Sequence, residues 1–87
     1  AFVYMFLEAM ADAAVKNGLS RKLAYKLAAE MIEGAGALAV ASEKHPGELK
    51  DEICSPGGTT IRGVSALEAC AFRNAVIEAV DATLRKW

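Results

Sequence analysis

The sequence predicts an all-α domain of about five helices. Apolar residues recur every three or four positions along most of the chain, and capping residues or prolines stand where these segments end. No run of alternating β-branched residues predicts a strand. With 87 residues, the chain (1–87) is expected to form a single domain.

The first predicted helix begins at residue 2 and carries a broad apolar stripe. Its members are Phe2, Phe6, Met10 and Ala13, widened by Val3, Leu7, Ala11 and Ala14. Asn17-Gly18 should end this helix, because both residues tolerate the left-handed conformation of a helix C-terminus. We expect Met5 and Met10, together with Met31 further on, to pack in the core.

The second helix is predicted to start after Ser20, a good N-cap, and to run to about Glu43. Its apolar stripe consists of Leu23, Leu27, Met31 and Leu38, with a small-residue edge of Ala24, Ala28, Ala35 and Ala39. Gly34 and Gly36 lie within this helix, where each costs about 1 kcal/mol relative to alanine. We expect them to allow the close approach of another backbone, and a kink is the alternative.

His45-Pro46 interrupts the helical pattern, and Pro46 is well placed to begin a short polar helix that ends near Ile53. The segment 54–60 is predicted to be a loop. Two further helices follow, one marked by Ile61, Val64, Leu67 and Ala71, the other by Phe72, Val76, Ala79, Val80, Thr83 and Trp87. We expect Trp87 to be buried against a neighbouring helix or chain.

Composition excludes several classes of protein. Hydrophobic residues make up 54% of the chain and the net charge is −1, which argues against a disordered segment and against a nucleic-acid binder. No apolar run reaches the length of a membrane span. Cys54, Cys70 and the single His45 do not form a zinc site, and both cysteines are expected to be buried in a reducing compartment. Because so short a chain cannot bury this much apolar surface alone, we expect a partner to cover it.

The segment Ser55-Pro56-Gly57-Gly58-Thr59-Thr60 is the most informative for function. Pro56 and the two glycines shape a tight loop, and a helix begins directly after it. The first N–H groups of that helix lack intrahelical partners, so a small carboxylate or phosphate could approach them over the glycines. From the residues alone, a rigid turn followed by a threonine cap is the favoured interpretation, because Pro-Gly-Gly loops commonly just turn the chain. We expect His45 to be a turn residue, and we expect the acidic residues from Glu48 to Glu52 to form a solvated helix face.

At this point the residues resemble a known family, the pyrroline-5-carboxylate reductases. The matching stretches are His45-Pro46-Gly47-Glu48-Leu49-Lys50-Asp51 and Ser55-Pro56-Gly57-Gly58-Thr59-Thr60-Ile61, flanked by residues 8–15, Phe72-Arg73 and residues 77–80. The resemblance covers essentially the whole chain, but only the C-terminal half of the family. It implies a helical dimerisation domain of the 6-phosphogluconate dehydrogenase C-terminal-like type, forming an interlocked homodimer that can assemble further. The start at Ala1, without an initiator methionine, agrees with a piece of a longer polypeptide.

The resemblance also implies the chemistry. The family reduces 1-pyrroline-5-carboxylate to L-proline with NADPH or NADH, which a separate Rossmann domain binds, and this segment alone is expected to be inactive. The substrate-binding residues would be Ser55, Gly57, Gly58, Thr59 and Thr60, with the backbone N–H groups around Gly58, Thr59 and Thr60 on the carboxylate. The Thr60 hydroxyl would be catalytic, contacting the ring nitrogen. We expect no metal, nucleic-acid or membrane partner and a cytoplasmic location. The alternatives are an association module without a ligand site, or the helical domain of a related dehydrogenase for another small acid.

Overall fold

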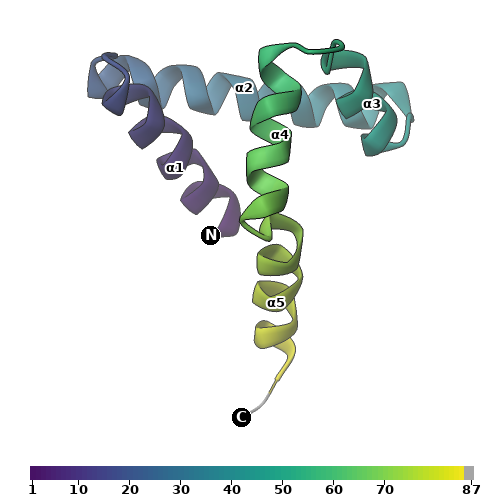
Figure 1. Ribbon diagram of the computed structural model, residues 1–87. Coiled ribbons are helices and arrows are strands. Elements are labelled where there is room, and N and C mark those ends of the chain that lie inside the picture. The colour runs from purple at the N-terminus through teal and green to yellow at the C-terminus, as the bar shows by residue number, and fades with distance from the viewer. Residues whose placement is uncertain (86–87) are drawn as a thin grey trace. The chain divides into compact units, whose positions relative to one another are not determined.

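The computed structural model describes residues 1–85, and they form five helices and no strand. The helices are α1 (Phe2–Lys16), α2 (Arg21–Ser42), α3 (Pro46–Ile53), α4 (Thr59–Ala69) and α5 (Phe72–Leu84) (Figure 1). The predicted all-α fold class is therefore confirmed. The chain divides into two compact units, Ala1–His45 and Pro46–Trp87. The expectation for Trp87 lies outside the described residues.

The turn between α1 and α2 is built around Gly18. Its φ of +109° lies in the left-handed region, whereas Asn17 has a φ of −99°. Gly18 N–H donates to the Val15 carbonyl and Leu19 N–H to the Ala14 carbonyl, both at 3.0 Å. This pair of bonds is the Schellman arrangement that satisfies the last carbonyls of a helix. The predicted helix end is thus confirmed, with Gly18 alone in the left-handed conformation.

Helix α2 begins as predicted and is longer than its neighbour. The Ser20 hydroxyl accepts a hydrogen bond from Leu23 N–H at 3.3 Å, which caps the helix, and Glu43 ends it with a φ of +58°. The helix continues without a break through Gly34 and Gly36. A Cβ atom built on either glycine would meet nothing within 4 Å. Within the described part of the chain, therefore, no backbone makes the close approach that these glycines allow.

Helices α1 and α2 touch mainly through alanines near their shared turn. The apolar residues buried in the described chain are Ala11, Ala24 and Ala28. On the surface beside this contact the Arg21 guanidinium pairs with the Asp12 carboxylate, and this hydrogen bond raises the pKa of Arg21 above its ordinary value. Figure 1 shows the two helices diverging away from the turn. An apolar groove of about 300 Å³ opens between them, lined by Met10, Ala14, Leu19, Ala24, Leu27, Ala28 and Met31.

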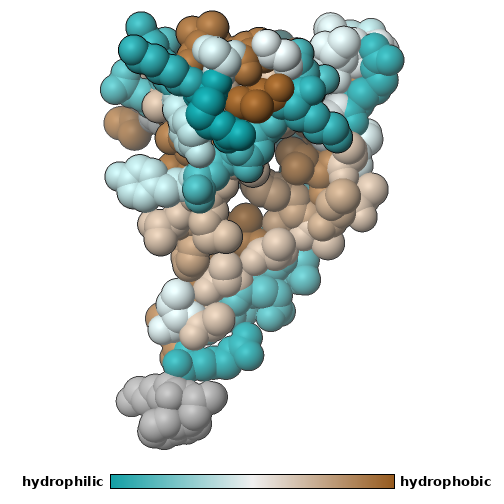
Figure 2. Space-filling model, turned by 90° about the vertical axis from the view of Figure 1, so that its left-hand side faces the viewer, coloured by the Kyte–Doolittle hydropathy of each residue, from teal (hydrophilic) through white to brown (hydrophobic). Residues whose placement is uncertain are grey.

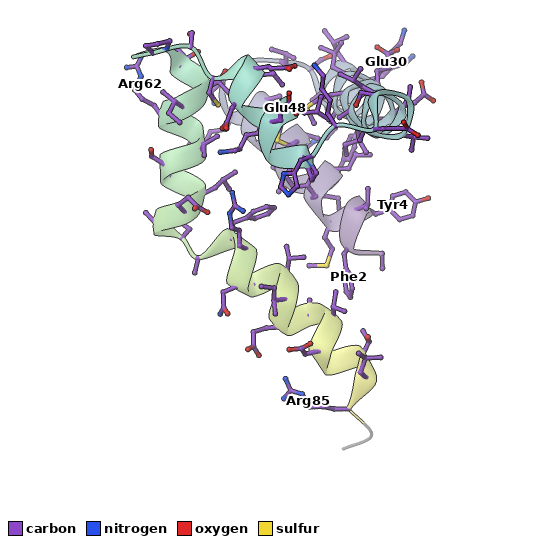
Figure 3. The ribbon with its side chains drawn as sticks, turned by 90° about the vertical axis from the view of Figure 1, so that its right-hand side faces the viewer. Phe2, Tyr4, Glu30, Glu48, Arg62 and Arg85 are labelled. Atoms are coloured by element: carbon purple, nitrogen blue, oxygen red, sulfur yellow. The ribbon has the colours of Figure 1, made fainter. Side chains whose placement is uncertain are left out.

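Large apolar side chains remain exposed on both units. Met5 is 66% exposed and Met31 42%, so the expectation that the methionines pack in the core is wrong for a single chain. The exposed set also includes Phe2, Leu23, Leu27, Leu38, Ile53, Leu67, Val76, Ile77, Val80 and Leu84. Apolar surface lies open between charged side chains in Figure 2, and the Phe2 side chain projects from the first turn of α1 in Figure 3.

The second unit contains a sharp junction between α4 and α5. Ala71 adopts a φ of +56°, its N–H donates to the Glu68 carbonyl at 3.0 Å, and Arg73 pairs with the Glu68 carboxylate at 3.0 Å. Helix α4 therefore ends at Ala69, two residues before the predicted boundary.

Cys70 is exposed and Cys54 half-buried, both as free thiols, so the expectation that they are buried is wrong. A shallow groove beside the junction is lined by Lys50, Val64, Leu67, Glu68, Phe72 and Arg73.

In residues 1–85, none of the helices combines the length and the apolar character needed to cross a membrane.

Candidate functional site

The loop between α3 and α4 is a tight turn over residues 55–58. Gly58 N–H donates to the Ser55 carbonyl at 3.1 Å, and Gly57 has a φ of +69°. Pro56 at the second position and a left-handed glycine at the third are the signature of a type II turn. The sequence therefore encodes the loop geometry directly, since proline presets one dihedral angle and glycine accepts the next.

Gly58 is required for space and not for its backbone angles. Its φ of −78° and ψ of 177° are extended values that any residue adopts. A Cβ atom on Gly58, however, would stand 2.5 Å from the Ser55 hydroxyl oxygen and 3.3 Å from the Ser55 carbonyl oxygen. The Ser55 hydroxyl therefore lies over Gly58, in the space that a side chain would fill.

Helix α4 begins immediately after this turn, and its first N–H groups point out of the helix end. Gly58 is the N-cap and supplies no side-chain hydrogen bond. Thr59 and Thr60 occupy the first turn and are exposed. Among residues 1–85, no backbone carbonyl outside the helix accepts a hydrogen bond from the N–H groups of Thr59, Thr60 or Ile61. These groups carry the positive end of the helix dipole, so the arrangement favours an anion.

The structure corrects the expected donor set at one position. Gly58 N–H was expected to hold a ligand carboxylate, but it donates to the Ser55 carbonyl within the turn. The donors left for an anion are the N–H groups of Thr59, Thr60 and Ile61 and the hydroxyls of Ser55, Thr59 and Thr60. All five predicted site residues lie in one turn and at the start of one helix, because they belong to the short segment 55–60.

Arg62 is a feature of this site to which the sequence analysis gave no role. Its Nε atom donates to the Gly58 carbonyl at 3.4 Å, so its guanidinium folds back toward the loop (Figure 3). The i to i+4 spacing from Gly58 to Arg62 is the signal that could have revealed this contact, since such pairs share one helix face. The contact holds a positive charge within one turn of the start of α4.

The other polar residues of this unit do not form a second site. Asp51 on α3 is exposed and pairs with Lys50 at 3.1 Å, in agreement with a solvated face. In the part of the chain that the structure describes, no group of three or more His, Cys, Asp or Glu side chains could hold a metal ion.

Comparisons with known proteins show which family shares this loop and these helices. The family model for pyrroline-5-carboxylate reductase dimerisation matches residues 1–87. The pyrroline-5-carboxylate reductase of Escherichia coli is 52% identical over 86 residues, which are 99% of this chain and 32% of that protein. The reductase of Treponema pallidum is 57% identical over 84 residues, 97% of this chain and 32% of the relative.

A solved structure shows the same fold. The pyrroline carboxylate reductase of Plasmodium falciparum, crystallised with NADP bound, matches with a TM-score of 0.90 and 43% identity, covering 93% of this chain and 33% of that one. The chain thus spans about a third of the length of the relatives that it matches.

Proposed function

Since the chain belongs to the pyrroline-5-carboxylate reductase family, by its dimerisation domain, we propose that it pairs two subunits of such a reductase and carries their substrate loop. The reaction would be the reduction of 1-pyrroline-5-carboxylate to L-proline, as the names of the relatives suggest. The observation that carries the proposal is the open N-terminus of α4, set behind a turn that places the Ser55 hydroxyl over Gly58.

The substrate carboxylate would sit on the N–H groups of Thr59 and Thr60. Charge-assisted hydrogen bonds from neutral N–H groups suit a carboxylate, and they need no counter-ion inside the loop. The Ser55 hydroxyl lies over Gly58 and is free to turn toward the same anion. The fold thus supports a cradle made largely of backbone, with the Arg62 guanidinium at its edge.

The Thr60 hydroxyl is proposed to contact the ring nitrogen of the bound pyrroline. A neutral hydroxyl can both donate and accept, so it suits a nitrogen whose protonation changes during the reaction. Its role is to hold the ring in one orientation, because positioning accounts for a large part of the rate in such a reaction.

The nicotinamide dinucleotide does not fit this part of the protein. A dinucleotide site needs a strand followed by a Gly-rich turn and a helix, and residues 1–85 contain no strand. We therefore place NADPH or NADH on the remaining two-thirds of the reductase, and we assign no residue of this chain to it.

Pairing with a second copy would remove the apolar surface that the single chain leaves exposed. Phe2, Met5 and Leu38, which are 46%, 66% and 55% exposed, are among the side chains that such pairing could cover. The two free thiols are compatible with the reducing cytoplasm as the compartment.

Steady-state kinetics of the whole reductase tests the loop. Thr60→Val removes the hydroxyl at nearly constant volume, and Thr60→Ser keeps it. We expect Thr60→Val to lower kcat/KM by about 10- to 100-fold, the loss expected for a hydrogen bond to a reacting group, and Thr60→Ser to retain most activity. Full activity of Thr60→Val would contradict the role proposed for the Thr60 hydroxyl.

Amide chemical shifts test whether the loop binds an anion at all. L-Proline titrated into the reductase should shift the N–H signals of Thr59 and Thr60 in a saturable way. The signals of Arg73 and Glu78, on α5, serve as the internal control. No shift at saturating proline would favour the association module without a ligand site.

Sedimentation equilibrium tests the pairing. We expect a dimer at micromolar concentration, and the same measurement reports assembly of dimers into larger particles. A compact, well-folded monomer at millimolar concentration would contradict the proposal.

A further inference from the structure

The middle of α2 contains two glycines for which the single chain offers no reason. Glycine weakens a helix interior because it leaves the backbone freer in the unfolded state. Gly34 and Gly36 nevertheless lie inside one unbroken helix, with helical backbone on both sides. A Cβ atom on either would meet nothing within 4 Å, so no neighbour within residues 1–85 requires the missing side chain.

The two glycines lie on different faces of α2. Gly34 continues the apolar stripe of Leu27, Met31 and Leu38, at spacings of seven, three and four residues. These three side chains are 46%, 42% and 55% exposed. Leu27 and Met31 also form one wall of the groove between α1 and α2, so the stripe is an extension of that groove. Gly36 is two residues further on, which turns it about 200° around the helix axis.

We propose that a helix of the second copy crosses α2 over Gly34 and packs against its bare backbone. The inference rests on the proposed homodimer and names the point of closest contact in it. The second copy is the chosen occupant because the stripe continues an apolar groove and because the family model that matches residues 1–87 is a dimerisation domain. Helices pack 8–10 Å apart, and a glycine at the crossing point allows the lower end of that range.

Gly34 and Gly36 form a matched pair for mutation. In an isolated helix, Gly34→Ala and Gly36→Ala would strengthen α2 equally, because neither new methyl group meets an atom. A difference between the effects of these two substitutions therefore requires a contact between chains. We expect Gly36→Ala to change the dimer dissociation constant by less than about 3-fold and Gly34→Ala to raise it by about 10-fold or more.

A larger side chain gives the stronger test. Gly34→Leu should raise the dissociation constant by about 100-fold or more, because overpacking at the crossing is repeated in both copies. Ala29→Leu is its control, since Ala29 is exposed and lies about 140° around α2 from Gly34, on a charged stripe with Lys22, Lys26 and Glu33. Circular dichroism at high concentration checks that each variant keeps its helices.

Sedimentation equilibrium of the wild type and these four variants decides the outcome. A wild-type dimer that Gly34→Leu and Ala29→Leu weaken equally would overturn the crossing at Gly34 and leave the proposed dimer intact. Equal effects of Gly34→Ala and Gly36→Ala would overturn it in the same way. A wild type that stays monomeric would refute the dimer itself, and with it this inference.

Discussion

Ser55 and Gly58 define the loop through two contacts at once. The Ser55 carbonyl accepts the Gly58 N–H at 3.1 Å, and the Ser55 hydroxyl oxygen lies 2.5 Å from the place that a Cβ on Gly58 would take. The first contact closes the turn. The second places a hydroxyl over the start of α4, beside the open N–H groups of Thr59 and Thr60. A side chain at residue 58 would therefore move that hydroxyl before it disturbed the turn.

Gly58→Ala should consequently impair substrate binding more than folding. The new methyl group has to displace the Ser55 hydroxyl, whereas the backbone angles of residue 58 suit alanine. In the whole reductase we expect KM for the pyrroline substrate to rise by about 10-fold, the value of one hydrogen bond to a charged group. Steady-state kinetics beside a thermal melt separates the two effects.

Gly63→Ala is the control for that substitution. Gly63 lies on α4 one turn further on, and a Cβ there meets nothing within 4 Å. The variant should keep its KM and gain up to about 1 kcal/mol of stability from the better helix former. If Gly58→Ala and Gly63→Ala shift KM alike, the Ser55 hydroxyl has no part in binding.

Gly57→Ala should destabilise the protein through backbone strain and not through a steric clash. A Cβ on Gly57 meets no atom within 4 Å, yet its φ of +69° is strained for any residue with a side chain. We expect a loss of about 1–2 kcal/mol in the free energy of unfolding, measured by urea denaturation at fixed protein concentration. Gly57→Asn should lose less, because asparagine tolerates the left-handed region. An unchanged urea midpoint for Gly57→Ala would show that the turn changes its conformation and removes the strain.

Local signals in the sequence identified the ends of the helices well. Ser20 caps α2, Gly18 closes the turn before it and Pro46 begins α3, and in each case one residue has a property that the position demands. The break at Ala71 carried no such signal, because alanine is a strong helix former and its left-handed φ is set by the junction of α4 with α5. The pattern of apolar residues therefore placed the boundary two residues late.

The packing of side chains was beyond what periodicity can show. The stripes of α1 and α2 were recognised, but a stripe does not say whether its own chain or another covers it. Met5, Met10 and Met31 were assigned to the core and are exposed in the single chain. The site residues were predicted as a group because they are contiguous, whereas the use of the Gly58 N–H inside the turn depends on the fold of the loop.

Ser20→Ala should measure what the cap of α2 contributes. The hydroxyl of Ser20 accepts from Leu23 N–H at 3.3 Å, and alanine leaves that donor without its partner. We expect the free energy of unfolding to fall by about 1 kcal/mol. Ser20→Asp, which retains an acceptor at the same place, should stay within about 0.5 kcal/mol of the wild type. A stability of Ser20→Ala equal to that of Ser20→Asp would mean that the cap contributes nothing.

Ala71→Gly should stabilise the protein, which is unusual for a change to glycine. Ala71 has a φ of +56°, a conformation that costs an L-residue about 1–2 kcal/mol and costs glycine little. Its carbonyl also accepts from Ala75 N–H at 2.9 Å as the N-cap of α5, a position at which glycine is preferred over alanine. Part of the gain is offset because glycine has more freedom in the unfolded chain, so we expect a net increase of about 0.5–1 kcal/mol.

The matched control is Ala69→Gly, two residues earlier and still inside α4. There the same change meets ordinary helical geometry, and we expect a loss of about 1 kcal/mol. Urea unfolding of both variants at one protein concentration keeps the contribution of pairing constant. Opposite signs for the two substitutions would establish the left-handed junction at Ala71, whereas a loss in both would place residue 71 in a regular helix and join α4 to α5.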